Sequence, residues 1–171
     1  PDGKWGAGPA LPGNRDRIIE TAGPIMEELL QATGESVQLY EVSGTTRTCI
    51  ATREPEAGLH NVVPVGRQLP LTSGSAARVI AAFAGIHVPD ATFSEHDIEL
   101  AKEDGYSVSI EEREAGLASI SAPVFDGAGT FIAALSVSGS AERFRPSPAD
   151  KFAPMLTAAA QKLSDALAAD A

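Results

Sequence analysis

The sequence predicts an α+β domain in which helices flank an antiparallel sheet. Two apolar runs enclose the turn-forming residues 126–129, so residues 116–139 are predicted to form a hairpin. Apolar residues recur at helical spacing over residues 14–33, before the first predicted strand, and again over residues 148–167. Helices placed before and after a run of strands indicate an α+β rather than an alternating architecture.

Composition narrows the classes of function. The chain has 171 residues, a formal net charge of −10 and a single cysteine, Cys49. This acidity argues against DNA binding by the chain alone, because phosphate contacts need clustered Lys and Arg. No apolar run approaches the roughly 20 residues of a membrane span, and one cysteine provides neither a disulfide framework nor a zinc site. We expect a cytoplasmic protein without cofactor, metal or membrane partner.

The N-terminal region begins with Pro1, so we expect a processed, tagged or partial chain. Residues 1–13 are rich in Gly and Pro and are predicted to be a short strand with turns or a linker. Residues 14–33 are predicted to be a helix that Asn14 caps and that Gly23-Pro24 kinks or divides.

That helix carries apolar residues on more than one face. They are Ile18, Ile19, Ile25, Met26, Leu29 and Leu30. Since one sheet cannot cover both sides of such a helix, we expect a second copy of the chain to cover it, in a homodimer or homotetramer.

The other elements are predicted from alternation, caps and turn residues. In chain order they are strands 37–42 and 45–52, an extended segment 62–71, a small-residue helix from Ser73 or Ser75 to Ala84, a helix 94–104 ended by Gly105, a strand 106–110, an acidic turn or bulge 111–114, and a last helix capped by Ser147 with Pro148 first.

The hairpin 116–139 has one wholly apolar face, predicted to be the core face. We expect Phe125 opposite Thr130, and Ser119 opposite Ser136. The core face then carries Ala118, Ile120, Ala122, Val124, Phe131, Ala133, Leu135 and Val137. The other face carries Pro123, Phe125 and Ile132 near the turn, and Ser119, Ser121, Ser136 and Ser138 at the open end.

The serine face allows two interpretations. Small side chains leave space, and their hydroxyls could hydrogen-bond a ligand placed there. Alternatively, the face is solvated and the serines are ordinary fillers. In the pocket interpretation the Ser136 hydroxyl meets only water or ligand, so we expect Ser136→Val to leave the empty protein equally stable.

No catalytic motif stands out. His60, His87 and His96 fit no metal-binding spacing, and no glycine-rich phosphate loop or G-x-S-x-G segment is present. The glutamates of residues 111–114 are most simply a solvated turn rather than a general acid/base pair. Cys49, in mid-strand, is expected to be a buried small residue. We therefore predict that the chain is not an enzyme.

Three blocks, in this order and spacing, carry a family resemblance: 65–71 leading into helix 75–84, Gly105-Tyr106-Ser107 ending in Glu111-Glu112, and Gly116 with 122–124 and 134–139. Over about residues 20–168 the chain resembles the effector-binding domain of the isocitrate lyase regulator (IclR) family of bacterial transcription factors. The resemblance implies a GAF-like fold, with residues 1–13 a remnant of a winged helix-turn-helix, 14–33 a linker helix and 34–171 the effector-binding domain. DNA would then be bound only through a missing N-terminal domain.

The resemblance also implies a pocket for a small organic effector, either a carboxylate or an aromatic compound. Its expected lining is Ser75, Ala76, Ser119, Ser136 and Ser138, with Leu69 and Leu71 as an apolar wall. Ser109 stands among them where many family members carry an acidic residue, and segment 83–105 looks shorter than usual. The alternative is a stand-alone GAF-like enzyme or cofactor sensor.

Overall fold

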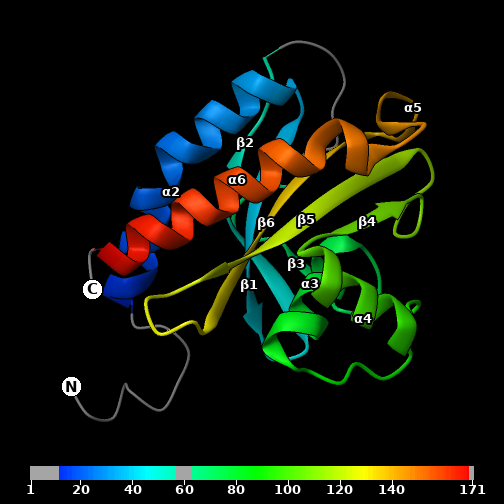
Figure 1. Ribbon diagram of the computed structural model, residues 1–171, viewed down its shortest axis with the longest axis horizontal. Helices are drawn as coiled ribbons and strands as arrows, with labels where there is room; N and C mark the ends of the chain where they lie inside the picture. Colours follow the sequence, from blue (N-terminus) through cyan, green and yellow to red (C-terminus); the bar gives the residue numbers. More distant parts are fainter. Residues whose placement is uncertain (1–11, 57–62, 170–171) are drawn as a thin grey trace.

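The computed structural model describes residues 12–56 and 63–169 and confirms the predicted α+β architecture (Figure 1). Its elements are α2 (Pro12–Thr33), β1 (Ser36–Ser43), β2 (Thr46–Arg53), β3 (Gln68–Pro70), α3 (Ser75–Ala84), α4 (Glu95–Asp104), β4 (Ser107–Ile110), β5 (Leu117–Phe125), β6 (Phe131–Ser140), α5 (Ala141–Phe144) and α6 (Pro148–Ala169).

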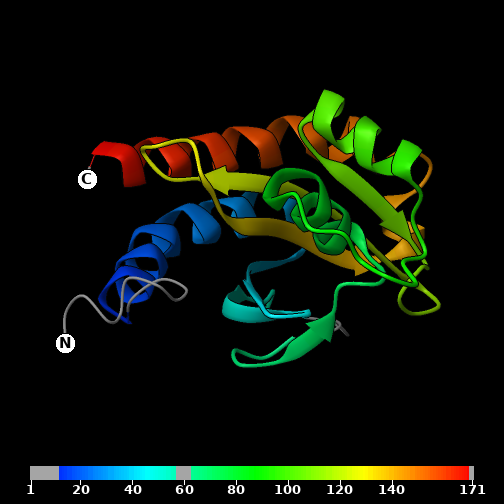
Figure 2. The ribbon, with the colours of Figure 1, turned by 90° about the horizontal axis from the view of Figure 1, so that it is seen from below.

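The strands form one six-stranded sheet in the order β3-β2-β1-β6-β5-β4, with every neighbouring pair antiparallel. Helices cover both faces: α2 and α6 lie together on one, and α3 lies on the other with α4 beside it (Figures 1 and 2). Side chains alternate between the two faces. Leu39 and Leu135 therefore belong to the core under α2 and α6, while Tyr40 and Ala134 pack toward α3.

The apolar side of helix α2 is covered within the single chain, with Ile19 partly buried. Its apolar residues Ile18, Ile25, Met26, Leu29 and Leu30 are each at most 8% exposed. The expectation that a second chain must cover them is wrong, because α6 of the same chain lies beside α2 on the same face of the sheet and packs against it. The helix begins at Pro12 and continues through Pro24, so Asn14 is not its cap and it is not divided.

The hairpin of β5 and β6 has a different register from the expected one. Ser119 pairs with Ser138 and Ser121 with Ser136, because the connection is longer and includes a bulge beside Val124. Asp126 organises this connection, since its carboxylate accepts hydrogen bonds from the backbone N–H groups of Ala128 (2.9 Å) and Thr130 (3.0 Å). A slip of two residues preserves the facing of most side chains, since the strand period is two.

The bulge does change the faces next to the turn. Phe131, expected on the core face, instead packs with the α3 side, where its ring meets that of Phe125 edge-on at 6.4 Å between centroids. Ile132 moves the opposite way and packs against the core under α6.

Several local signals are confirmed. Ser94 and Asp97 form the capping box of α4, and Gly105 ends that helix with a φ of 80°. The hydroxyl of Ser147 accepts a hydrogen bond from the Asp150 N–H (3.3 Å) at the start of α6. The short α5 was not expected. Within the segment expected to be extended, the only described strand is β3, and residues 57–62 lie outside the described part.

Among the helices of the described residues, none is both long enough and apolar enough to cross a membrane.

Candidate functional site

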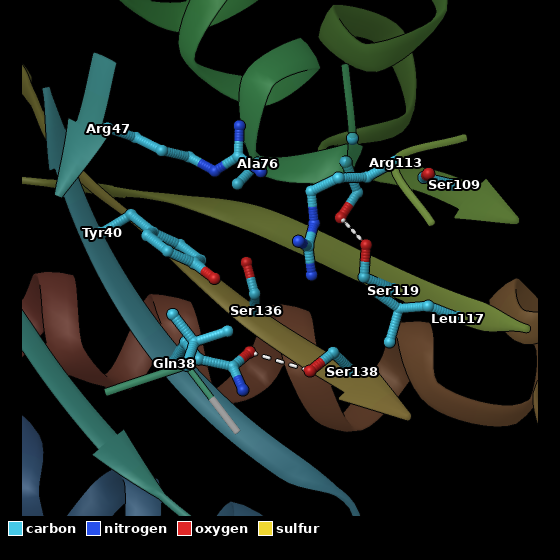
Figure 3. Close-up of a pocket in the computed structure, with 13 residues that line it drawn as sticks. Gln38, Tyr40, Arg47, Ala76, Ser109, Arg113, Leu117, Ser119, Ser136 and Ser138 are labelled. Atoms are coloured by element: carbon cyan, nitrogen blue, oxygen red, sulfur yellow. Dashed lines mark hydrogen bonds between the residues drawn. The ribbon is translucent and has the colours of Figure 1, made fainter. Parts of the chain in front are cut away.

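A small cavity lies between the sheet and the N-terminal end of α3 (Figure 3). Six of the eight predicted site residues line it: Ser75, Ala76, Ser109, Ser119, Ser136 and Ser138. The space open to a water-sized sphere is about 20 Å³, which is room for about one water molecule. The serine face is therefore enclosed rather than solvated.

The serine hydroxyls form a hydrogen-bonded chain across three elements. Ser75, at the start of α3, lies with its Oγ 2.6 Å from that of Ser119 and 2.7 Å from that of Ser121. Ser121 in turn contacts Ser136, with 2.5 Å between the hydroxyl oxygens. This chain ties the helix to the middle of β5 and β6. The helix and the serine-bearing strands thus form one rigid wall of the cavity.

Leu69 and Leu71 do not line the cavity. Both are buried, 4% and 3% exposed, in the apolar cluster under α3 that contains Val79 and Ile80. The apolar part of the lining comes instead from Val63 and Leu117, and further polar groups join it. These come from β1, β2 and the 111–116 turn and were not anticipated: Gln38, Tyr40, Arg47 and Arg113.

Arg47 is a buried cation, only 3% exposed. Its Nη1 donates to the carbonyls of Pro70 (2.6 Å) and Ser73 (3.2 Å), and its guanidinium carbon lies 5.2 Å from the centre of the Tyr40 ring. Burial raises the pKa of Tyr40 to about 12, so that hydroxyl is a neutral phenol at neutral pH and supplies no negative charge. Burial also lowers the pKa of Arg47, although not enough to discharge a guanidinium near neutrality.

The turn at residues 111–116 is held in place by ion pairs and is not simply solvated. Glu112 forms an ion pair with Arg78 of α3. Its carboxylate also accepts a long hydrogen bond from the backbone N–H of Gly74, at 3.5 Å. Glu111 pairs with Arg145 at 2.8 Å and accepts a hydrogen bond from the Gly116 N–H at 2.8 Å. These contacts fix the backbone on either side of Arg113.

Arg113 itself reaches from this turn into the cavity, where its side chain lies between Ser119 and Ser136 (Figure 3). Its guanidinium forms no hydrogen bond or ion pair with any described residue. Two other donors at the cavity also lack an acceptor in the described part of the chain, namely Nε2 of Gln38 and Nε of Arg47. Gln38 uses only its oxygen, which accepts from Ser138 at 3.0 Å.

The chemistry of the site is that of binding through hydrogen-bond donors. No aspartate or glutamate is among its lining residues. In the described residues no three His, Cys, Asp or Glu side chains gather as metal ligands. Cys49 is buried nearby in β2, and burial raises the pKa of its thiol to about 11, so it is not a reactive thiolate.

The family model "Bacterial transcriptional regulator IclR C-terminal" matches residues 14–165. Among curated proteins, the HTH-type transcriptional repressor AllR of Salmonella paratyphi A is 29% identical over 159 residues, which are 82% of this chain and 58% of AllR. AllR of Escherichia coli K12 is 28% identical with the same coverage. The chain thus spans a little over half the length of these curated relatives.

Solved structures agree with this assignment. The C-terminal domain of the E. coli transcriptional regulator KdgR superposes with a TM-score of 0.73 at 27% identity, covering 88% of this chain and 98% of that domain. IclR of Thermotoga maritima, at 24% identity, shows the same fold with a TM-score of 0.77, over 88% of this chain and 68% of that one. The chain belongs to the family of IclR C-terminal domains of bacterial transcriptional regulators.

Proposed function

We propose that this chain is the effector-binding and oligomerisation domain of a bacterial transcriptional regulator, and that its cavity binds a small carboxylate. The observation that carries this is a set of donors at the cavity that lack an acceptor among the described residues: the buried Gln38 Nε2 and Arg47 Nε, and the guanidinium of the half-buried Arg113. A buried donor left unpaired costs about 1–3 kcal/mol, so an acceptor placed among these groups is favoured.

The polar walls favour a carboxylate over an aromatic effector. An aromatic ring needs a broad apolar surface, whereas Leu69 and Leu71 lie away from this cavity, and its lining adds only Val63, Ala76 and Leu117 to the polar side chains. A carboxylate offers two oxygens that accept several hydrogen bonds, and charge-assisted bonds of this kind are about twice as strong as neutral ones.

An ion pair and a strand pairing lie between the cavity and the C-terminal end of helix α2. Glu35, between α2 and β1, accepts two hydrogen bonds from Arg143 of α5, at 2.9 and 2.8 Å. Its neighbour Ser36 pairs with Ser138, a cavity residue on β6. A ligand that shifts the end of β6 therefore acts on the C-terminal end of α2. We propose that helix α2 is the linker to a DNA-binding domain outside this chain. Regulation then follows from different ligand affinities of two arrangements.

The proposal includes a cytoplasmic location, a dimeric or tetrameric assembly and the absence of catalysis. The AllR relatives are named as repressors rather than enzymes. The cavity offers a reaction no carboxylate or thiolate, since its lining is made of hydroxyl, amide, phenol, guanidinium and apolar groups. A stand-alone enzyme is accordingly the weaker alternative.

Calorimetric titration of the chain with acetate, malonate and benzoate tests the proposal. Carboxylate binding should weaken in Ser119→Ala, whose hydroxyl lines the cavity, and not in Thr130→Ala, which lies in the exposed β5–β6 connection. The fold should survive Ser119→Ala because Ser75 keeps its bond to Ser121. Binding that is unchanged in Ser119→Ala would refute the site, and heat from benzoate alone would show an aromatic effector instead of a small aliphatic carboxylate.

A further inference from the structure

Among the described residues that line the cavity, two are cations, Arg47 and Arg113, and none is an anion. We propose that the cavity selects dianions over monoanions, with Arg47 and Arg113 each facing one negative charge of a short dicarboxylate. This inference rests on the proposed function, because it specifies which anion the same cavity takes. The number of charges on the ligand follows from the position of Arg113.

Arg47 supplies the first charge. Its guanidinium is almost completely buried, and it contacts two backbone carbonyls and the ring of the neutral Tyr40. Carbonyl dipoles orient the group without neutralising it. A buried charge without a counter-charge is strongly unfavourable, so this side of the cavity favours an anion.

Arg113 supplies the second. It comes from the opposite side, on the turn held by Glu111 and Glu112, and its guanidinium faces the space between Ser119 and Ser136 (Figure 3). The two arginines repel each other, and the charge of Arg113 contributes to lowering the pKa of Arg47. Either charge makes the other more costly until an anion enters.

Water does not remove this cost. The space of about 20 Å³ holds about one water molecule, which can accept hydrogen bonds from two donors but neutralises neither guanidinium. A monocarboxylate neutralises one of the two charges, and a dianion neutralises both. Arg47 is almost completely buried and Arg113 is partly buried, so solvent and salt screen the charge of Arg47 only weakly and that of Arg113 in part.

Arg113 is also the group that can make room. The other lining side chains are tied to the protein: Ser75, Ser119 and Ser136 through the serine chain, Ser138 to Gln38, and Arg47 to backbone carbonyls. Arg113 can swing outward without breaking a hydrogen bond to a described residue. Because the starting space is only about 20 Å³, we expect a short dianion such as oxalate, malonate or succinate to fit rather than a long one.

Calorimetry with matched ligands tests the proposal on the wild-type chain. The affinity for malonate should be at least about tenfold higher than that for its monomethyl ester, which has nearly the same shape and one negative charge less. Inorganic phosphate is the second arm: if phosphate binds and no dicarboxylate does, the dianion site stands and its ligand is a phosphate. Equal affinity for malonate and its half-ester overturns the inference, and leaves the proposed carboxylate site intact.

Variants locate the second charge. Arg113→Gln should reduce the malonate preference to within about twofold while monomethyl malonate still binds, whereas Arg113→Lys should keep it. Arg67→Gln is the matched control, since it makes the same change in net charge at an exposed position away from the cavity. A malonate preference that persists in Arg113→Gln assigns the second charge elsewhere and overturns the role of Arg113. If no carboxylate and no phosphate binds the wild type, both this inference and the proposed effector class fail.

Discussion

The hydroxyl oxygens of Ser121 and Ser136 lie 2.5 Å apart on paired strands, and both side chains are at most 2% exposed. Their contact exists because β5 and β6 pair two residues away from the expected register. In the expected register Ser136 faced Ser119 and its hydroxyl was free for solvent or ligand. In the structure it is part of the protein's own hydrogen-bond network.

This pairing reverses the expectation for Ser136→Val. The variant leaves Ser121 with Ser75 as its one remaining partner and places extra methyl groups beside a cavity that holds about one water. We expect the free energy of unfolding of the ligand-free chain to fall by about 1–2 kcal/mol, as measured by urea denaturation. Ser119→Ala, at the outer end of the chain of hydroxyls, should lose less than half as much. An unchanged midpoint for Ser136→Val would mean that the bond adds nothing to stability.

Much of the fold follows from local signals in the sequence. Caps at Ser94 and Ser147, the stop at Gly105 and the period-two pattern of β5 and β6 all act within a few residues. The register failed because the turn length was ambiguous within residues 126–130, and one bulge was enough to exchange the faces of Phe131 and Ile132.

The site was half predictable. Its serines share one face of a hairpin, so alternation placed them together. Gln38 left a usable signal, being a polar residue in the middle of an otherwise apolar stretch of β1. Arg47 and Arg113 left no such signal, because they meet at the cavity only through the pairing of β2 with β1, of β1 with β6 and of β6 with β5. Contacts between residues so far apart in sequence depend on topology, which local pattern does not encode.

The turn that carries Arg113 should loosen in acid. The hydrogen bond from Arg145, followed by that from the Gly116 N–H, lowers the pKa of Glu111 below its ordinary value. A carboxyl whose folded-state pKa is lowered adds stability above its unfolded pKa and loses it as the pH falls through the folded one. Glu111→Gln removes this contribution. The difference in melting temperature between wild type and variant should be largest near neutral pH and shrink as the pH falls below the ordinary glutamate range.

The matched control for that experiment is Glu56→Gln, which alters an exposed glutamate outside this turn and should give a difference that does not vary with pH in the same way. A constant difference for Glu111→Gln across the acid range would show that its ion pair does not hold the turn.

The Glu35–Arg143 pair at the root of α2 should be asymmetric. The side chain of Glu35 is 6% exposed and that of Arg143 50%, so Arg143→Gln strands a buried carboxylate, whereas Glu35→Gln leaves an arginine that can turn to water. Gly139 closes the space around Glu35, because even a Cβ there would lie 3.1 Å from its carboxyl carbon. We expect Arg143→Gln to lower the free energy of unfolding by about 2–3 kcal/mol, discounted for the exposure of the arginine, and the double variant Glu35→Gln/Arg143→Gln to recover part of this loss.

Lys162→Gln breaks the exposed pair with Glu28 and should change stability by less than about 0.5 kcal/mol. Urea denaturation of the four variants gives the comparison, and an Arg143→Gln loss no greater than that of Lys162→Gln would contradict the role of this pair in anchoring α2.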